Sequence, residues 1–293
     1  MSYDFYLNIL IAGLLNGTVY GLMALGLSVI FGVMRIVNFA HGEMMVLGMY
    51  AAFLLHVWLG VDPLLALPLV ALLLFAFGYG LQGTLINRFI NVPEHQQFLL
   101  LLAVGIILTN ALLLGFGPDA RAVQVDYAFD SFEVGPLVID KVRVYAAGVA
   151  ALLAIALFAF FRLTLTGKSI RACADNFLGA QVVGLNIRRL YNLTFGLGAA
   201  CVGAAGALIL MLVDVHPHLA VDFTLLAFVI VIVGGLGSLG GALLGGILVG
   251  VAETLPALLT FLSIPPSMKS MFSFGLLILV LLLRPEGLLG RRA

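Results

Sequence analysis

Long apolar runs dominate the chain, and most of them have the length that a membrane-crossing helix requires. A helix needs about 20 apolar residues to cross a hydrocarbon core about 30 Å thick. The sequence therefore predicts an all-α membrane protein with eight or nine crossings, in a single domain covering residues 1–293. The candidate crossings are 7–33, 42–60, 64–86, 97–117, 144–163, 190–213, 223–235, 242–262 and 270–284. The run 223–235 is short, so it is expected to be re-entrant or broken.

Composition supports this interpretation. The chain is 63% hydrophobic and 10% charged, whereas soluble domains are about 25% charged. The net charge is zero, which gives no reason to expect a nucleic-acid partner. Cys173 and Cys201 are too few for a disulfide framework and are interpreted as small apolar residues.

The basic residues predict an orientation with the N-terminus outside and the C-terminus inside, because cytoplasmic loops are enriched in Lys and Arg. The inside then holds ten such residues: Arg35, Arg88, Arg162, Lys168, Arg171, Arg188, Arg189, Arg284, Arg291 and Arg292. The outside holds four: Arg121, Lys141, Arg143 and Lys269. An acidic external loop at 118–143 and a cytoplasmic loop at 164–189 follow from this topology.

Two short patterns imitate nucleotide sites. Gly235, Gly237 and Gly240 have the GxGxxG spacing, but that fingerprint needs a strand and a helix in a soluble βαβ unit, and both flanks here are apolar enough to lie in lipid. The expected role of these glycines is helix packing. Gly167-Lys168-Ser169 lacks the glycine of a phosphate-binding loop, since Arg162 occupies that position. We therefore expect no ATP site and no bound cofactor in this chain.

Apolar residues within the 164–189 loop recur at helical spacing. Ile170, Cys173, Phe177, Ala180 and Gly184 predict one face of a helix about sixteen residues long, with Gly184 as its C-cap. Two interpretations stay open: a helix that lies on lipid headgroups, or one that enters a groove of a partner protein.

Several residues inside the apolar runs are candidates for packing or transport. Gly13, Gly17 and Gly21 form a ridge typical of close helix contact. Asn38, His41, Glu43 and Glu253 are candidate residues of a translocation pathway, because polar groups in a membrane need a cavity or a protein partner. Glu253 is predicted near the middle of the bilayer, facing the interior. His216, Pro217 and His218 are interpreted as a polar turn, and no metal site is expected.

Four stretches carry a family resemblance: GLLNGTVYGLMALGLSVIFGVMRIVNFAHGEMMVLGMY, GKSIRACADNFLGAQVVGLN, VGGLGSLGGALLGGILVGVAE and LRPEGLLG. Together they resemble the smaller permease subunit of branched-chain amino acid ABC importers. The resemblance implies that residues 168–184 form a coupling helix that docks on a cytoplasmic ATPase. Its candidate coupling residues are Lys168, Arg171, Ala172, Ala174, Asp175 and Gly184.

The same resemblance implies the partners and the location. These are a second homologous permease, two ATP-binding subunits that use the ATP, an extracytoplasmic binding protein and the lipid of a bacterial cytoplasmic membrane. Three alternatives remain: a permease for urea or short amides, a self-sufficient secondary transporter, and an oxidoreductase that binds a nicotinamide nucleotide at the glycine run.

Overall fold

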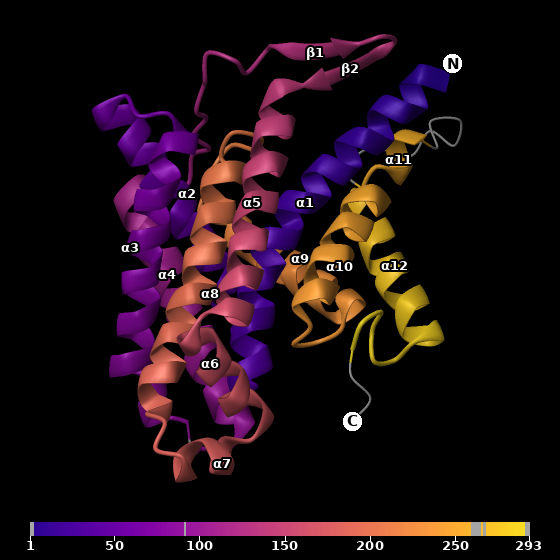
Figure 1. Cartoon of the computed structure of the whole chain (residues 1–293). Coiled ribbons are helices and arrows are strands. Elements are labelled where there is room, and N and C mark those ends of the chain that lie inside the picture. Colours follow the sequence, from indigo (N-terminus) through magenta and orange to yellow (C-terminus); the bar gives the residue numbers. More distant parts are fainter. Residues whose placement is uncertain (1–2, 91, 259–264, 266–267, 291–293) are drawn as a thin grey trace.

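The computed structural model describes residues 3–90, 92–258, 265 and 268–290, and within them the chain is a bundle of helices (Figure 1). The main helices run up and down the bundle, and the N-terminus and the C-terminal part lie at opposite ends of it. The helices of the bundle are α1 (Tyr3–Met34), α2 (His41–Leu59), α3 (Pro63–Thr84), α4 (Glu94–Phe116), α5 (Lys141–Leu163), α8 (Ile187–Ile209), α9 (Leu219–Gly234), α10 (Leu239–Ala252) and α12 (Lys269–Leu283).

Each predicted crossing coincides with one of these helices. In the described ranges, seven segments are long and apolar enough to span a membrane, whereas α9 and α12 are shorter apolar helices. The predicted 242–262 crossing corresponds to the candidate span Leu239–Leu258, within which α10 ends at Ala252 and the four-residue helix α11 (Leu255–Leu258) follows. Residues 259–262 of that run lie outside the described residues. The predicted 190–213 run is too long, because α8 ends at Ile209.

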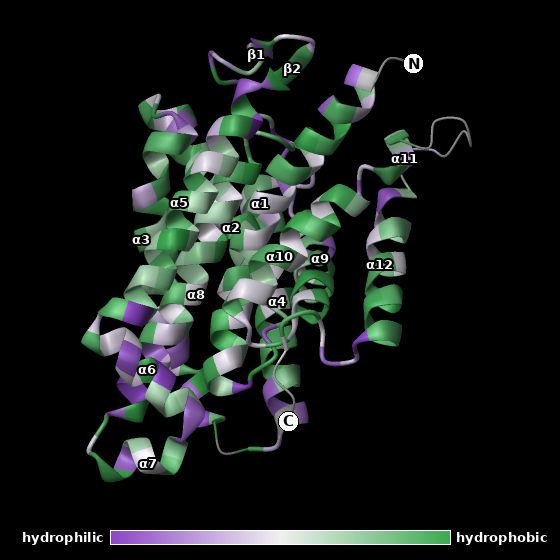
Figure 2. Ribbon diagram, turned by 45° about the vertical axis from the view of Figure 1, so that its right-hand side comes forward, coloured by the Kyte–Doolittle hydropathy of each residue, from purple (hydrophilic) through white to green (hydrophobic). Residues whose placement is uncertain are grey.

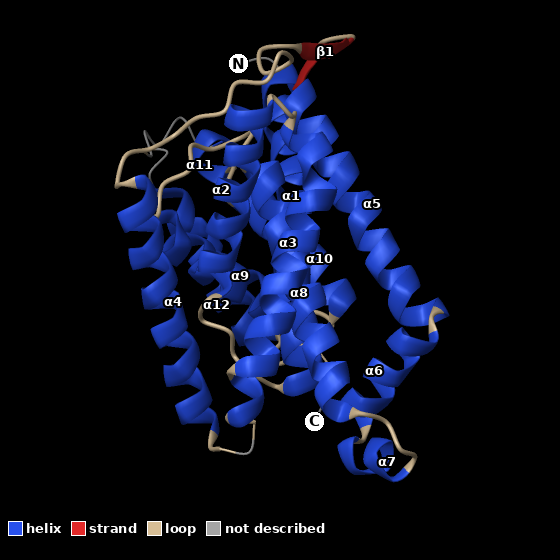
Figure 3. Cartoon of the chain, turned by 90° about the vertical axis from the view of Figure 1, so that its left-hand side faces the viewer, coloured by secondary structure: helices blue, strands red, loops and turns tan. Residues whose placement is uncertain are grey.

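Short elements gather at the two ends of the bundle. At the end where the N-terminus lies, β1 (Ser131–Val134) pairs with β2 (Leu137–Asp140) in an antiparallel hairpin (Figure 3). The predicted 118–143 loop therefore ends in a hairpin and in the first turn of α5. At the other end lie α6 (Leu165–Asp175) and α7 (Phe177–Val182), and a 3-10 turn (Ile86–Arg88) follows α3. Polar residues are conspicuous around α6, while apolar residues cover the middle of the bundle (Figure 2).

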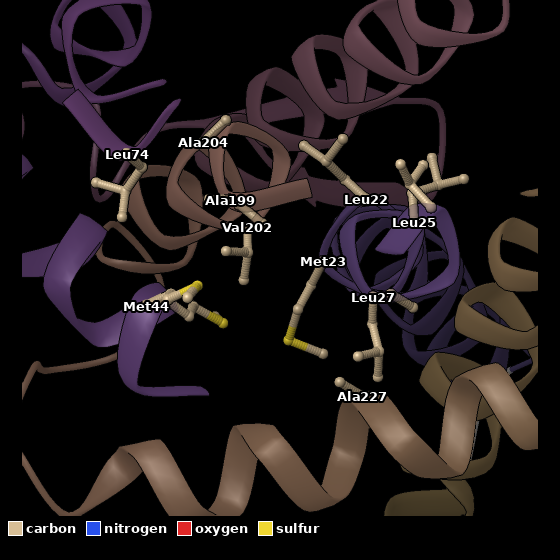
Figure 4. Packing of buried hydrophobic residues seen from close by; sticks show 14 of the residues in the cluster. Leu22, Met23, Leu25, Leu27, Met44, Leu74, Ala199, Val202, Ala204 and Ala227 are labelled. Carbon is tan, nitrogen blue, oxygen red and sulfur yellow. The ribbon is translucent and has the colours of Figure 1, made fainter. Parts of the chain in front are cut away.

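The core lies where α1, α2, α8 and α9 meet. Leu22 and Met23 of α1, Met44 of α2 and Ala199 of α8 are fully buried, and the side chains of Met23 and Met44 point into the space between α1, α2 and α9 (Figure 4). Small residues on α8 let it pack against its neighbours at short range, as membrane helices commonly do. Gly203, for example, faces Leu74 of α3, and a Cβ on it would lie 2.5 Å from Leu74 Cγ.

The predicted glycine ridge of α1 packs against α10. A Cβ on Gly17 would lie 2.7 Å from the Cα of Ile247, and one on Gly13 would lie 2.9 Å from Thr254 Cγ2. From the α10 side, a Cβ on Gly246 or Gly250 would run into the backbone of α1. We call this contact the glycine seam; it brings two backbones together with almost no side chain between them.

The second glycine run forms the turn between α9 and α10. Gly235 and Gly237 have φ values of 104° and 75°, a region that side-chain-bearing residues rarely adopt. The segment after α12 returns to this turn, where Leu288 N donates to Val233 O and Leu289 N donates to Gly234 O, both at 2.9 Å. A Cβ on Gly240 would be only in ordinary contact, 3.6 Å from Leu289. The run therefore joins two apolar helices, not a strand and a helix.

Candidate functional site: a chamber between helices and an exposed helix pair

A chamber of about 470 Å³ lies between α1, α9, α10 and α12. This volume is within the range of small-molecule sites, which are mostly apolar and carry a few polar groups. The apolar wall includes Val19 and residues of α9, while the charged groups are Glu253, Asp222, Arg143 and Lys269. The arrangement can therefore accommodate a small molecule that is apolar over one part and charged over another.

Glu253 is the acidic group most enclosed by protein in this chamber. The Tyr20 hydroxyl donates to its Oε2 at 3.1 Å, and the Ser273 hydroxyl donates to its Oε1 at 3.3 Å. A charged group at the centre of a bilayer costs about 2.5 to 3.5 kcal/mol on insertion scales. Two hydrogen bonds to the carboxylate offset part of that cost. Tyr20, Glu253 and Ser273 thus link α1, α10 and α12 at one point.

Tyr20 gives the depth of Glu253 in the bundle. It lies fourteen residues before the end of α1 and seventeen after its start, which is about 21 Å and 26 Å along the helix axis. Glu253 is therefore level with the middle of α1 and lines the chamber, while Lys269, one turn before its partner Ser273, starts α12 at the hairpin end of the bundle. The local setting of Glu253 differs from the prediction, because it is the residue that ends α10 and not a residue inside a continuous helix.

Basic residues line the same chamber. Lys269 begins α12, one turn before Ser273, and it is exposed. Arg143 lies in the first turn of α5, where its Nε is 3.1 Å from Asp140 Oδ2. Asp222 is in the first turn of α9 and is exposed, where the helix dipole favours a negative charge.

The start of α2 forms a second cluster of polar residues inside the bundle. His41 Nε2 donates to Met23 O at 3.0 Å, and Met23 lies eleven residues before the end of α1. The chain thus re-enters the bundle by about 16 Å before α2 begins. Gly42 N donates to Thr224 Oγ1 of α9 at 2.9 Å, and Ala40 N donates to Asn38 Oδ1 at 3.1 Å.

These contacts divide the predicted pathway residues into two groups. Asn38 and His41 are fully buried, Glu43 is 7% exposed, and none of the three lines the chamber that Glu253 lines. The predicted break near Gly42 is present, and neighbouring protein satisfies the freed backbone groups. A Cβ on Gly42 would collide with Ala220 O and Thr224, so α2 and α9 can approach only because residue 42 is a glycine.

The predicted single helix of residues 168–184 is wrong: the structure has two helices that meet at Asn176. This residue has extended backbone angles (φ −148°, ψ 96°), and its side chain accepts a hydrogen bond from Gly179 N at 2.8 Å. Asn is a preferred N-cap because its side chain satisfies an otherwise free amide. The helical spacing of the apolar residues continues across 176, which is why periodicity alone did not reveal the break.

Gly184 ends the second helix, as predicted. It has a φ of 82°, its N–H donates to Gln181 O, and Leu185 N donates to Ala180 O, both at 3.0 Å. This pair of bonds is the Schellman arrangement, which favours glycine.

The apolar face of this region is split between two environments. Ile170, Cys173 and Ala180 are buried against the chain's own helices, and burial raises the pKa of the Cys173 thiol. Phe177 (42% exposed) and Gly184 are on the surface. The predicted coupling residues Lys168, Arg171, Ala172 and Asp175 are also exposed, whereas Ala174 is half-buried. A patch of exposed apolar residues covers α7: Phe177, Leu178, Val182 and Val183.

Loops at the opposite end are held together by Arg121. Its backbone forms an antiparallel bridge with Val215, its guanidinium donates to Phe116 O at 2.7 Å, and it lies 5.6 Å from the centres of the Phe53 and Phe116 rings. The Tyr127 hydroxyl donates to both oxygens of Asp62, which also accepts from Leu64 N as the N-cap of α3. Burial, with these contacts to Asp62, raises the pKa of Tyr127.

His216 and His218 lie in the turn before α9, with ring centres 6.5 Å apart. No group of three or more His, Cys, Asp or Glu residues suited to a metal ion occurs in the part of the chain that the structure describes.

Sequence reasoning missed most of the chamber residues. Tyr20, Arg143, Asp222, Lys269 and Ser273 come from four helices whose mutual arrangement no local pattern reveals. Tyr20 could have been found from the sequence, since it follows Asn16 by one helical turn and the two polar residues mark one face of an otherwise apolar helix. Thr224 had none, because a single Thr is common in membrane helices.

The fold and the chamber define a polytopic membrane protein of the solute-transport class. The sequence matches the family described as "Branched-chain amino acid transport system / permease component" over residues 9–281, and the chain belongs to this family. It is 32% identical to the high-affinity branched-chain amino acid transport system permease protein BraD of Pseudomonas aeruginosa, over 98% of this chain and 96% of BraD. The permease protein LivH of Escherichia coli K12 is 31% identical, with the same coverage of both chains.

Two more distant comparisons add to this. The permease protein LivM of Escherichia coli K12 is 25% identical over 92% of this chain and 68% of LivM. The structure of PsaBC from Streptococcus pneumoniae in complex with Fab contains a chain with a TM-score of 0.50 and 14% identity. That match covers 97% of this chain and 94% of that one, and it shows a similar fold alone.

Proposed function

We propose that this chain forms half of the translocation pathway of an ABC importer for branched-chain amino acids in the cytoplasmic membrane of a bacterium. Full-length similarity to BraD and LivH, which are named for that transport, carries the proposal. The weaker similarity to LivM favours a second, homologous permease as the partner that completes the pathway. Separate ATPases would supply the energy and an extracytoplasmic binding protein would deliver the substrate.

The topology that fits this function has nine crossings, with the N-terminus outside and the C-terminus inside. The ends of α1, α3, α5 and α12, the α6–α7 region and the start of α8 carry eight described basic residues: Arg35, Arg88, Arg162, Lys168, Arg171, Arg188, Arg189 and Arg284. The hairpin end carries Arg121, Lys141, Arg143 and Lys269, together with five acidic residues in the 118–143 loop. The excess of basic residues favours a cytoplasmic location for α6 and α7.

The α6–α7 pair would be the part that contacts the ATPase. Apolar surface on α7, next to the basic residues of α6, suits a groove in a protein better than it suits water. Ile170 and Cys173 fix α6 to the bundle, so a displacement of α7 would be transmitted to α5 and α8 through the short connections at Thr164 and Asn186. Charge reversal by Arg171→Glu should therefore lower ATP-dependent uptake while the amount of inserted protein stays unchanged.

Reconstitution tests the proposal directly. The full chain is combined in proteoliposomes with a second permease, candidate ATPases and a binding protein, and uptake of labelled leucine and urea is measured. We expect leucine uptake that needs ATP and every component. Uptake by this chain alone would show a secondary transporter, and preference for urea would show an amide permease; either result would contradict the proposal.

A further inference from the structure

We propose that the chamber holds the transported amino acid as a zwitterion, with its ammonium on Glu253, its carboxylate toward Lys269 and its aliphatic side chain against α9. This inference rests on the proposed function and adds a substrate site within this single subunit. It starts from Glu253, a half-buried carboxylate of the chamber that accepts two hydrogen bonds and, among the described residues, has no Lys or Arg within 4.0 Å.

Two observations leave Glu253 in need of a positive charge. In the described ranges the ion pairs within 4.0 Å are Lys141 with Asp130 and Arg143 with Asp140, so Glu253 takes part in none. It also ends α10, and the C-terminus of a helix is the negative end of its dipole, which disfavours a carboxylate. Its two hydrogen bonds fix the orientation of the carboxylate without neutralising it.

The ligand that fits best is a primary ammonium. Metal ions such as Ca²⁺ take six to eight oxygen ligands, and no cluster of three acidic or metal-binding side chains is found in the described segments. An ammonium needs only a few acceptors at hydrogen-bond distance. The two oxygens of Glu253, with the hydroxyl oxygens of Tyr20 and Ser273 beside them, provide such a set.

The position of Lys269 matches the other end of an amino acid. Lys269 precedes Ser273 by four residues on α12, so both lie on one face of the helix, about 6 Å apart along its axis. Ser273 contacts Glu253, which places a positive charge one helical turn from the negative one. The ammonium and carboxylate of an α-amino acid are separated by a single carbon, so Lys269 is in reach of the carboxylate through its flexible side chain.

The wall of the chamber suits an aliphatic side chain. Phe223, Leu226 and Val229 follow one another at helical spacing on α9 and line the chamber together with Val19. Apolar contact of this kind favours leucine, isoleucine or valine over a polar amino acid.

Binding by the purified full chain in lipid nanodiscs tests the site. The probes are leucine, 4-methyl-2-oxopentanoate, which lacks the ammonium, and leucinol, which lacks the carboxylate. We expect Glu253→Gln to weaken leucine binding at least tenfold and to abolish the preference for leucine over the oxo acid. Glu133→Gln, an exposed change in the hairpin, is the matched control and should bind like the unmodified chain.

Two further variants keep the test decisive if Glu253→Gln fails to fold. Lys269→Gln should weaken leucine binding several-fold while leucinol binding stays unchanged, and Ser273→Ala should weaken the binding of both. The site is refuted if leucine binds no better than the oxo acid, if Glu253→Gln and Lys269→Gln both bind leucine normally, or if sodium ions displace leucine competitively.

The binding experiment and the uptake experiment can fail independently of each other. ATP-dependent leucine uptake without Glu253-dependent binding would overturn this site and leave the importer intact. Glu253-dependent binding without any ATP-dependent uptake would overturn the importer and leave the site.

Discussion

The bundle contains two clusters of polar residues among its apolar helices, and the clusters use their polar groups in different ways. At the start of α2, His41 and Gly42 make their hydrogen bonds to the backbone and side chains of α1 and α9. In the chamber, Glu253 accepts hydrogen bonds from Tyr20 and Ser273, and no Lys or Arg in the described ranges lies within 4.0 Å of its carboxylate. The first cluster stabilises a helix that begins inside the bundle, and the second leaves a charge for a ligand. Substitutions should therefore affect stability in the first cluster and transport in the second.

The largest expected effect is in the first cluster. Gly42→Ala adds a methyl group that would collide with Ala220 O, so α2 and α9 would have to separate at a cost of about 3 kcal/mol. We expect little folded protein in the membrane fraction and a lower Tm in detergent. Gly80→Ala is the control, since a Cβ there meets nothing within 4 Å; equal behaviour of the two variants would contradict the contact.

The next effect is in the chamber. Glu253→Leu should reduce leucine uptake by at least tenfold, while the Tm stays unchanged or rises, because replacing a half-buried carboxylate that has no ion-pair partner in the described ranges with an apolar residue removes its desolvation cost. Uptake in the reconstituted system and thermal unfolding of the same preparation measure the two quantities. A large loss of Tm with uptake per folded molecule unchanged would place Glu253 with the structural cluster.

A smaller effect is expected at Thr224. Thr224→Val keeps the shape of the side chain but leaves Gly42 N without its acceptor, which should cost about 1 to 3 kcal/mol of stability. The Tm should fall, whereas uptake per folded molecule should not. Thr224→Ser, which keeps the hydroxyl, should retain most of the Tm.

The smallest effect is expected at Tyr20. Tyr20→Phe removes one hydrogen bond to Glu253 and keeps the ring, so stability should change by about 1 kcal/mol or less. Uptake should fall about threefold, since the carboxylate is less firmly oriented. Uptake equal to that of the unmodified chain would show that Ser273 alone holds Glu253 in place.

Apolar run length was enough to locate the helices, because each run must match a fixed hydrocarbon thickness. Run length did not show where a helix ends while the sequence stays apolar, as at Ala252. Apolar periodicity did not show the break at Asn176, because this N-cap interrupts the helix while the spacing of apolar residues continues. Gly184 was predictable because a left-handed cap favours glycine. Similarly, the ridge of Gly13, Gly17 and Gly21 showed that a helix would pack closely there, but not that α10 would be that helix.

The chamber was the least predictable feature for the same reason. Glu253 stands out in a sequence because a lone acid in an apolar run is costly. Its partners Tyr20 and Ser273 are 233 and 20 residues away in the chain, and both residue types occur freely in membrane helices. Only the packing of α1 and α12 on α10 brings them together.

The glycine seam also constrains how this subunit can move. Sliding α1 along α10 would bring side-chain-bearing residues of α1 to places where even a single Cβ, added at Gly17 or Gly21, would lie 2.7 Å from Ile247 or 3.1 Å from Leu243. The two helices should therefore move as one rigid body during any change of conformation. The distance between spin labels placed on the lipid-facing sides of α1 and α10 should therefore stay constant through the transport cycle. This fixed pair would serve as a reference for measuring the displacement of the other helices.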